Sequence, residues 1–116
     1  MAQKGLHKYT VQEAQNATMG QAGAIFYDGT GTAIEPSSGQ VFVAIQFITD
    51  TNFDASNGLI GEDDNMWPSV TGTSSSVLSA GAGTAIDAVI FPAGMTIYGR
   101  WNKILLDSGS IIAYIG

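Results

Sequence analysis

The chain has 116 residues, no cysteine, and 4 basic against 10 acidic residues, which gives a formal net charge of −6 at pH 7. This length fits a single domain, and the lack of cysteine excludes disulfides, thiolate nucleophiles and thiolate metal ligands. The few basic side chains form no patch that could neutralise a run of phosphates or an anionic membrane surface, so we expect neither nucleic acid nor membrane as a partner.

The first segment, residues 1–20, is polar and weakly patterned, and we interpret it as an extended N-terminal arm in front of one β domain at residues 21–116. Its stretch VQEAQNATM could instead form a short helix, although it lacks a clear apolar stripe. The arm is either a loose tail or a segment that orders against a partner. In the second case its interface residues are Lys4, Leu6, His7 and Tyr9.

Signals for membrane insertion or export are missing from the sequence. No apolar run reaches the ~18 residues of a membrane-spanning helix. The stretch MAQKGLHKYT lacks the apolar core of a secretory signal. We therefore expect a protein that is made in a cytosol and is used or assembled there.

Strand patterns begin at residues 24–27, a short apolar run that the turn signal YDGTG follows. TAIE at 32–35 is extended again, so 22–40 predicts a hairpin or two short strands. Residues 41–48 predict the strongest strand, because they are rich in β-branched and aromatic side chains. Alternation gives this strand two largely apolar faces, so we expect burial on both sides. One face carries Val41, Val43, Ile45 and Phe47, and the other carries Phe42, Ala44, Gln46 and Ile48.

The stretch from residue 49 to residue 83 is rich in Ser, Thr and Gly and predicts long polar loops. We expect short strands around 59–60 and 77–78. Met66 and Trp67 stand out in this stretch, because exposed Met and Trp are typical interface anchors. The alternative is that Trp67 folds back as a lid over the core.

The last third of the chain predicts a strand at 85–90, a PAG turn at 92–94 and a long strand at 95–106. A DSG turn at 107–109 predicts that residues 110–116 return as the antiparallel partner of the long strand. The alternation within 95–106 has two phases. One holds Ile97, Trp101 and Leu105, and the other holds Tyr98, Ile104 and Leu106.

These elements predict an all-β protein of about seven or eight short strands with little or no helix. Charged residues make up only 12% of the chain, which suits strands and tight turns better than exposed helices. We expect one small β-sandwich or jelly-roll-like barrel with long polar loops and the extended N-terminal arm.

Catalytic motifs are missing from the sequence, and we expect no enzyme, no cofactor and no metal. His7 is the only histidine, and a lone histidine in a polar arm is typically solvated, so neither a zinc site nor a Ser-His-Asp triad is expected. No glycine-rich loop continues into a P-loop or a dinucleotide-binding pattern.

Two acidic groupings allow alternatives. Oxygen-bearing side chains recur at Asp50, Asn52, Asp54 and Ser56, a spacing similar to that of a calcium loop. Ala55 stands where such a loop needs glycine, and Glu62 falls one residue past the bidentate position, so a plain polar turn is favoured. The run EDD at 62–64 is typical of solvated loop charges, although paired carboxylates could run glycoside hydrolysis.

The end of the chain, FPAGMTIYGRWNKILLDSGSIIAYIG at 91–116, resembles the ends of small virion proteins of tailed bacteriophages. The stretch VFVAIQFITDTNFD at 41–54 is similar to a companion segment of the same proteins. Together the two cover roughly a third of the chain, and the middle loops carry no such resemblance.

The resemblance implies a capsid decoration (cement) protein on the virion surface, assembled in the host cytoplasm. Its implied partners are the major capsid protein and further copies of itself, commonly in a trimer. Large aromatic side chains exceed what a small core easily buries, so some of them should face a partner. The candidates outside the arm are Met66, Trp67, Tyr98 and Trp101.

Two rival functions remain open. The first is a tail or fibre component, such as a receptor- or carbohydrate-binding tip, because Trp67 and Asp, Asn, Ser or Thr in loops suit sugar contacts. The second is a small hydrolase that works through Glu62, Asp63 and Asp64.

Overall fold

The computed structural model describes residues 23–29, 31–63, 66–72 and 78–116. These residues form strands and no helix, so the predicted all-β class is confirmed for the part of the chain that is described. None of them belongs to a helix that is long and apolar enough to cross a membrane. The predicted arm at residues 1–20 lies outside the described residues. The domain predicted at residues 21–116 is described from residue 23 onward.

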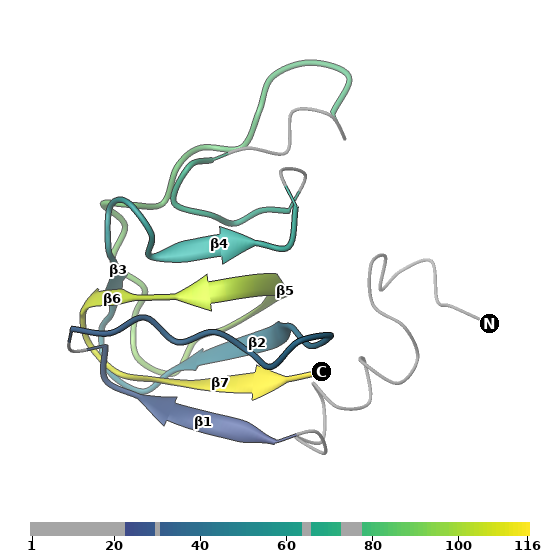
Figure 1. The fold of residues 1–116 in the computed structure, drawn as a ribbon. Helices are drawn as coiled ribbons and strands as arrows, with labels where there is room; N and C mark the ends of the chain where they lie inside the picture. The colour runs from purple at the N-terminus through teal and green to yellow at the C-terminus, as the bar shows by residue number, and fades with distance from the viewer. Residues whose placement is uncertain (1–22, 30, 64–65, 73–77) are drawn as a thin grey trace.

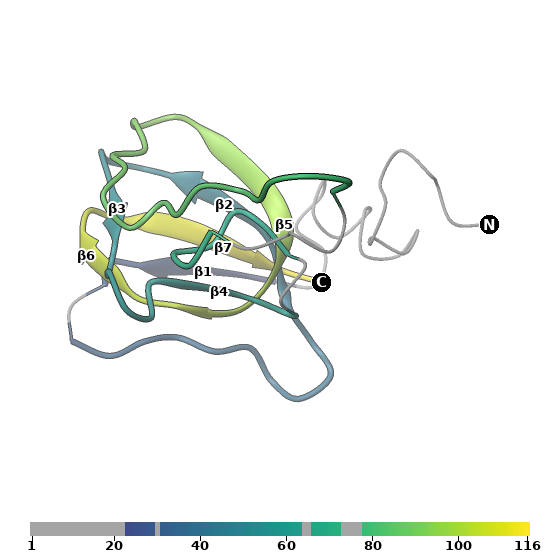
Figure 2. The same ribbon diagram turned by 90° about the horizontal axis from the view of Figure 1, so that it is seen from above.

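The described residues contain seven strands. They are β1 (Ala24–Tyr27), β2 (Phe42–Phe47), β3 (Asn52–Phe53), β4 (Leu59–Gly61), β5 (Thr96–Ile104), β6 (Leu106–Ser108) and β7 (Ile111–Ile115). Five of them form one antiparallel sheet in the order β1-β7-β2-β5-β4, and β3 pairs with β6 in a second, two-stranded antiparallel sheet. Figure 1 shows the five strands stacked, with β4 and β1 at the two edges, and Figure 2 shows β5 bending around the side of the molecule.

The predicted hairpin between residues 95–106 and 110–116 is wrong. β2 lies between β5 and β7 and is antiparallel to both, so β5 and β7 run in the same direction. The chain leaves the large sheet after Ile104 and pairs β6 with β3 before it reaches β7. Gly109 makes the return possible, because its φ of 103° is open to glycine and a side chain there would collide with Thr51.

Three further strand predictions are wrong or only partly met. Residues 32–35 contribute one isolated bridge, Ile34 to Ile104, and the partner of β1 is β7 instead. Residues 85–90 form no strand, because the N–H of Val89 donates to the carbonyl of Ile86 and closes a turn. Of the strand expected at 77–78, Leu78 lies in a bend and residue 77 is outside the described residues. The strands predicted at 24–27, 41–48 and around 59–60 are confirmed.

A β-bulge in β2 changes which side chains share a face. β2 is buried on both sides, as predicted, but its register shifts between Phe42 and Ala44 against both neighbouring strands. Phe42 therefore joins Ile45 and Phe47 in the main core. Val41, Val43 and Ala44 pack with Tyr114 in a separate small cluster on the opposite side of the sheet.

Bulges also change which side chains of β5 lie on the same face of the sheet. Register shifts interrupt it opposite β2 and again opposite β4. Sequence alternation placed Trp101 on the face opposite Ile104 and Leu106, whereas all three side chains lie in the main core. Each extra residue in a bulge turns the following side chains to the other face, so strict alternation fails across β5.

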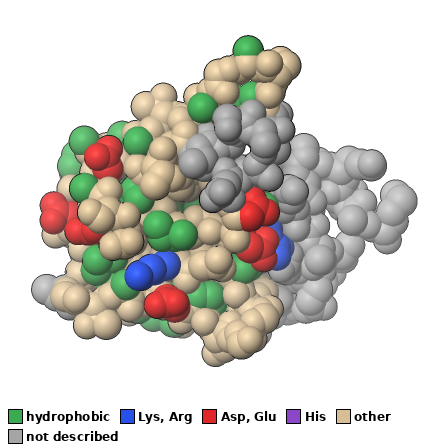
Figure 3. Space-filling view, turned by 45° about the horizontal axis from the view of Figure 1, so that its top comes forward, with side chains coloured by type: hydrophobic (Ala, Val, Ile, Leu, Met, Phe, Trp, Pro, Cys, Tyr) green, Lys and Arg blue, Asp and Glu red, His purple; other side chains and the backbone are tan. Residues whose placement is uncertain are grey.

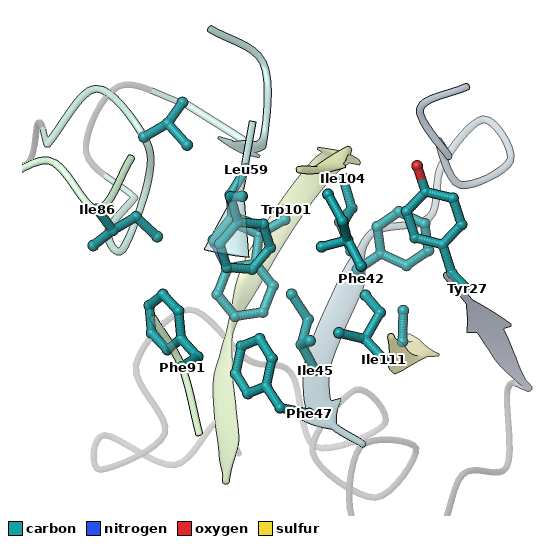
Figure 4. Packing of buried hydrophobic residues seen from close by; sticks show 14 residues of the cluster. Tyr27, Phe42, Ile45, Phe47, Leu59, Ile86, Phe91, Trp101, Ile104 and Ile111 are labelled. Carbon is teal, nitrogen blue, oxygen red and sulfur yellow. The ribbon is translucent and has the colours of Figure 1, made fainter. Parts of the chain in front are cut away.

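The main core is built from aromatic and branched aliphatic side chains of both sheets and of the loops (Figure 4). The rings of Phe47 and Phe91 stack with centroids 4.9 Å apart, and Phe53 meets both edge-on at 5.9 and 5.5 Å. Offset-stacked and edge-to-face rings are the favourable arrangements of aromatic pairs. This group joins β2, β3 and the segment that precedes β5.

Two leucines provide a direct test of where the core lies. Leu59 is fully buried in the main core, whereas Leu78 is 48% exposed. We expect Leu59→Ala to lower the free energy of unfolding by about 2–5 kcal/mol and Leu78→Ala to change it by less than about 0.5 kcal/mol. Urea denaturation of both variants measures this, and equal losses would contradict the described core.

Tyr27 should make stability depend on alkaline pH. Its hydroxyl donates to the carbonyl oxygen of Thr32 at 2.7 Å. Burial raises the pKa of the Tyr27 phenol, a backbone hydrogen bond from Leu106 partly opposes this rise, and the charge of Asp28 adds to it. The folded state thus holds the phenol proton more tightly than the unfolded state does, and this contribution is lost as pH rises above the ordinary pKa of about 10.

We expect Tyr27→Phe to lower the free energy of unfolding at pH 7 by about 1 kcal/mol, the usual value of one hydrogen bond. The difference from the wild type should shrink above about pH 10, because the variant has no phenol to ionise at this position. Urea denaturation of both proteins at neutral and alkaline pH measures this. A difference that stays constant or widens with pH would contradict it.

Candidate functional site

One face of the five-stranded sheet points away from the main core, and we call it the outer face. Strand alternation and the observed register place two rows of side chains on it. The first row, from β1 to β5, is Phe26, Ile112, Gln46 and Thr96, and the second is Ala24, Tyr114, Ala44 and Tyr98. None of these eight side chains is charged.

Two aromatic rings are the exposed large hydrophobic side chains in the two rows of the outer face. Phe26 is 64% exposed and Tyr98 is 61% exposed. They stand on β1 and β5, so three strand spacings of about 4.8 Å separate their strands. Between them the Tyr114 hydroxyl donates to Oε1 of Gln46 at 3.3 Å, and Ala44 is buried. Exposed apolar rings over an uncharged surface are typical of a contact surface for another macromolecule.

Trp67 forms a second exposed aromatic position, in the loop at residues 66–72. Its indole N–H donates to the carbonyl of Thr84 at 2.9 Å. The ring lies against Gly83, where an added Cβ would be 2.7 Å from Cδ1 of the indole. Trp67 is 45% exposed and is outside the main core, so it does not form the alternative lid. The indole of Trp67 is fixed by this hydrogen bond and is accessible to solvent. Its role as an interface anchor stays a prediction.

The other predicted interface residues divide into two groups. Met66 and Trp101 are buried, with exposed fractions of 9% and 0%, so neither lies on the surface of the folded chain. Trp101 is held inside by its indole N–H, which donates to the carbonyl of Pro68 at 2.9 Å. We therefore leave both out of the candidate surface. The candidates in the arm, Lys4, Leu6, His7 and Tyr9, lie outside the described residues.

Sequence reasoning missed Phe26. It predicted the strand at 24–27 but not which of its side chains faces solvent. The available signal was alternation, which puts Phe26 opposite the buried Tyr27. That signal decides nothing until the partner strand is known, because β1 pairs with β7 and not with the residues that follow it.

The residues spaced like a calcium loop make hydrogen bonds to the backbone and to side chains within the fold. Oδ2 of Asp54 accepts the N–H groups of Ser56 and Asn57 at 3.0 and 3.1 Å, and Oδ1 of Asp50 accepts the N–H of Ala93 at 2.9 Å. Asn52 bonds to Asp107 and Ser108 across β3 and β6. These oxygens close turns and join strands. Within the described ranges, no three His, Cys, Asp or Glu residues gather as a metal site.

Glu62 of the EDD run is paired with Arg100. Nε of Arg100 donates to Oε1 at 2.7 Å and Nη2 donates to Oε2 at 2.9 Å. This bidentate pair fixes the carboxylate on β5. On the face drawn in Figure 3, acidic side chains lie in small separate groups, some of them beside Lys or Arg. The pair is a structural link between the end of β4 and β5, whereas Asp64 of the same run lies outside the described residues.

Comparisons with known proteins add no identity to this geometry. Neither a protein-family model, nor a curated protein, nor a solved structure matches the chain.

The two tryptophans should differ sharply in solvent access. We expect Trp67→Phe to leave a blue-shifted emission that acrylamide quenches weakly, because only the buried Trp101 remains. Trp101→Phe should leave a red-shifted emission that acrylamide quenches readily. Steady-state fluorescence of both variants, with the urea-unfolded chains as references, measures this. Strong quenching of the Trp67→Phe variant in its folded state would show that Trp101 is not buried.

Proposed function

We propose that this chain is a structural protein of a tailed-bacteriophage virion, a decoration protein that binds the major capsid protein lattice and stabilises the head. Two lines of support meet here. One is the resemblance of residues 41–54 and 91–116 to small virion proteins. The other, which carries the proposal structurally, is the two uncharged rows of the outer face, with Phe26 and Tyr98 exposed in them.

The proposed role extends to fold, assembly and location. Two antiparallel sheets that share one core are compatible with a β-sandwich or a jelly-roll-like barrel. We propose a homo-oligomer, a trimer as the resemblance implies, at the capsid surface after assembly in the host cytoplasm. Many copies on a repeating lattice convert weak single contacts into tight overall binding, so a modest contact face is sufficient.

A second candidate function is a tail or fibre component that binds a receptor or carbohydrate. The observation that favours it is the half-exposed indole of Trp67, held by the Thr84 carbonyl. An aromatic ring beside polar loop groups is a common platform for a sugar ring. Inhibition of phage adsorption by the purified protein, and its loss in Trp67→Ala, would favour this function over decoration.

Copy number separates the two functions. Quantitative mass spectrometry of purified particles from the source should find this chain in a simple ratio to the major capsid protein if it decorates the head. A dozen or so copies would place it in the tail. Absence from particles would remove both proposals.

Tyr98 provides the variant test of head binding. We expect Tyr98→Ala to weaken binding to heads assembled without this chain by about 30-fold or more, the effect of losing a central aromatic contact. Val89→Ala is the control, because Val89 is also exposed (42%) but lies in a loop outside the outer face. Cosedimentation with heads measures both. Equal binding of the two variants, with both folded, would mean that the outer face does not meet the shell.

A further inference from the structure

The two edges of the five-stranded sheet differ in whether they are covered. At the β4 edge, the N–H of Val70 donates to the carbonyl of Leu59 at 3.2 Å, so the loop at residues 66–72 closes this edge. The β1 edge has no such cover among the described residues (Figure 1). An uncovered edge is a template for another strand.

The register shows which backbone groups of β1 face outward. The N–H of Ile115 donates to the carbonyl of Gly23 at 3.0 Å, so Gly23, Ile25 and Tyr27 direct their groups toward β7. Ala24 and Phe26 therefore direct their N–H and C=O groups away from the sheet. These four groups have no hydrogen-bond partner among the described residues.

β1 also lacks the features that usually protect an edge strand. Its sequence AIFY has no charge and no proline, and its pairing with β7 is regular. Three of its four residues are exposed, including Ile25 at 36% and Phe26 at 64%. Natural edge strands are normally blunted by lysine, proline or a bulge. The β1 edge is thus suited to pairing.

We propose that β1 pairs edge to edge with β1 of a second copy of this chain, antiparallel about a two-fold axis at Ile25. In this register Ala24 lies opposite the partner's Phe26, and Phe26 lies opposite the partner's Ala24. All four outward groups of each strand are then paired, in four hydrogen bonds. The small Ala24 leaves room for the partner's Phe26 on the outer face, and the two Ile25 side chains meet on the other face.

A second copy fits this edge better than the chain's own preceding residues. The stretch QEAQNATMGQA at 12–22, which leads into β1, is made mostly of residues that strands disfavour, whereas β1 is rich in strand formers. Each chain carries a formal net charge of −6, which opposes association, but β1 itself is uncharged, so the two strands meet without like charges.

The size of the contact sets its strength. Four strand residues per copy bury less than the roughly 1,200 Å² of a standard stable interface, so the dimer should be weak in dilute solution. It would become populated at high concentration or on a lattice that holds copies side by side. This contact is independent of the proposed binding to a shell and of a three-fold assembly through another surface.

Amide hydrogen exchange on the full chain tests the proposal with an internal control. The amides of Ile25 and Tyr27 bond to β7 and should be protected at every concentration. Those of Ala24 and Phe26 should exchange about fivefold more slowly near 1 mM than near 20 μM, as the dimer forms. Protection of Ala24 and Phe26 at all concentrations would mean that residues of the same chain cover the edge. Rapid exchange at all concentrations would mean that nothing does, and either result overturns the proposal.

Charge substitution at the two-fold axis provides an independent test by sedimentation velocity. Ile25→Lys and Ile25→Glu should each remain monomeric, because like charges lie directly opposite one another. An equimolar mixture of the two should form a dimer again. Thermal unfolding of each variant checks that the monomer is folded. If a variant does not fold, Ala24→Pro is used in its place, because proline removes one outward N–H at the start of the strand. Ala24→Ser is the control for this substitution. Dimers in the single charge variants, or none in the mixture, would overturn the pairing.

Discussion

The hydrogen bond from the Trp101 indole to the Pro68 carbonyl connects the centre of the sheet to the most irregular part of the chain. A fully buried indole needs a partner for its N–H, and here the partner belongs to the loop that carries Trp67. Gly99 makes this position possible, because a Cβ there would lie 2.5 Å from Cζ2 of the indole. The loop is held further by the bond from Val70 to Leu59. The exposed Trp67 therefore depends on the buried Trp101, which bonds to the carbonyl of Pro68, the next residue in the chain.

The bulges of β2 and β5 create that arrangement, and they are also where sequence reasoning fails. Strand existence at 24–27 and 41–48 was predictable, because apolar β-branched and aromatic runs have few alternatives. The faces were not, since one extra residue reverses every following side chain. The exchange of partners at the C terminus was not predictable either. A short turn such as DSG favours a local hairpin. In the structure β6 pairs with β3 instead, and this pairing depends on contacts between segments that are far apart in the sequence.

The candidate site was predictable in part for the same reason. Tyr98 and Trp67 were identified as unusual aromatics, and both are exposed. Trp101 was identified on equal grounds and is buried, because aromatic type does not reveal on which side of a bulge a residue falls. Phe26 needed the pairing of β1 with β7 before its exposure could be inferred. Residue type thus indicated that the surface would be aromatic, and the strand pairing determined which aromatic residues lie on it.

The low charge of the chain has different consequences on the two surfaces proposed for contacts. On the outer face, side chains would make the contact, so its strength depends on ring area and on how well a partner fits Phe26 and Tyr98. At the β1 edge, backbone groups would make the contact, so its strength depends on register and on the side chains that lie directly opposite one another, such as the two Ile25 residues. Phe26 belongs to both surfaces, because its side chain stands on the face while its backbone lies at the edge. Pairing through β1 would place two outer faces in one continuous sheet. A lattice partner would then meet twice the uncharged area without any new side chain being exposed.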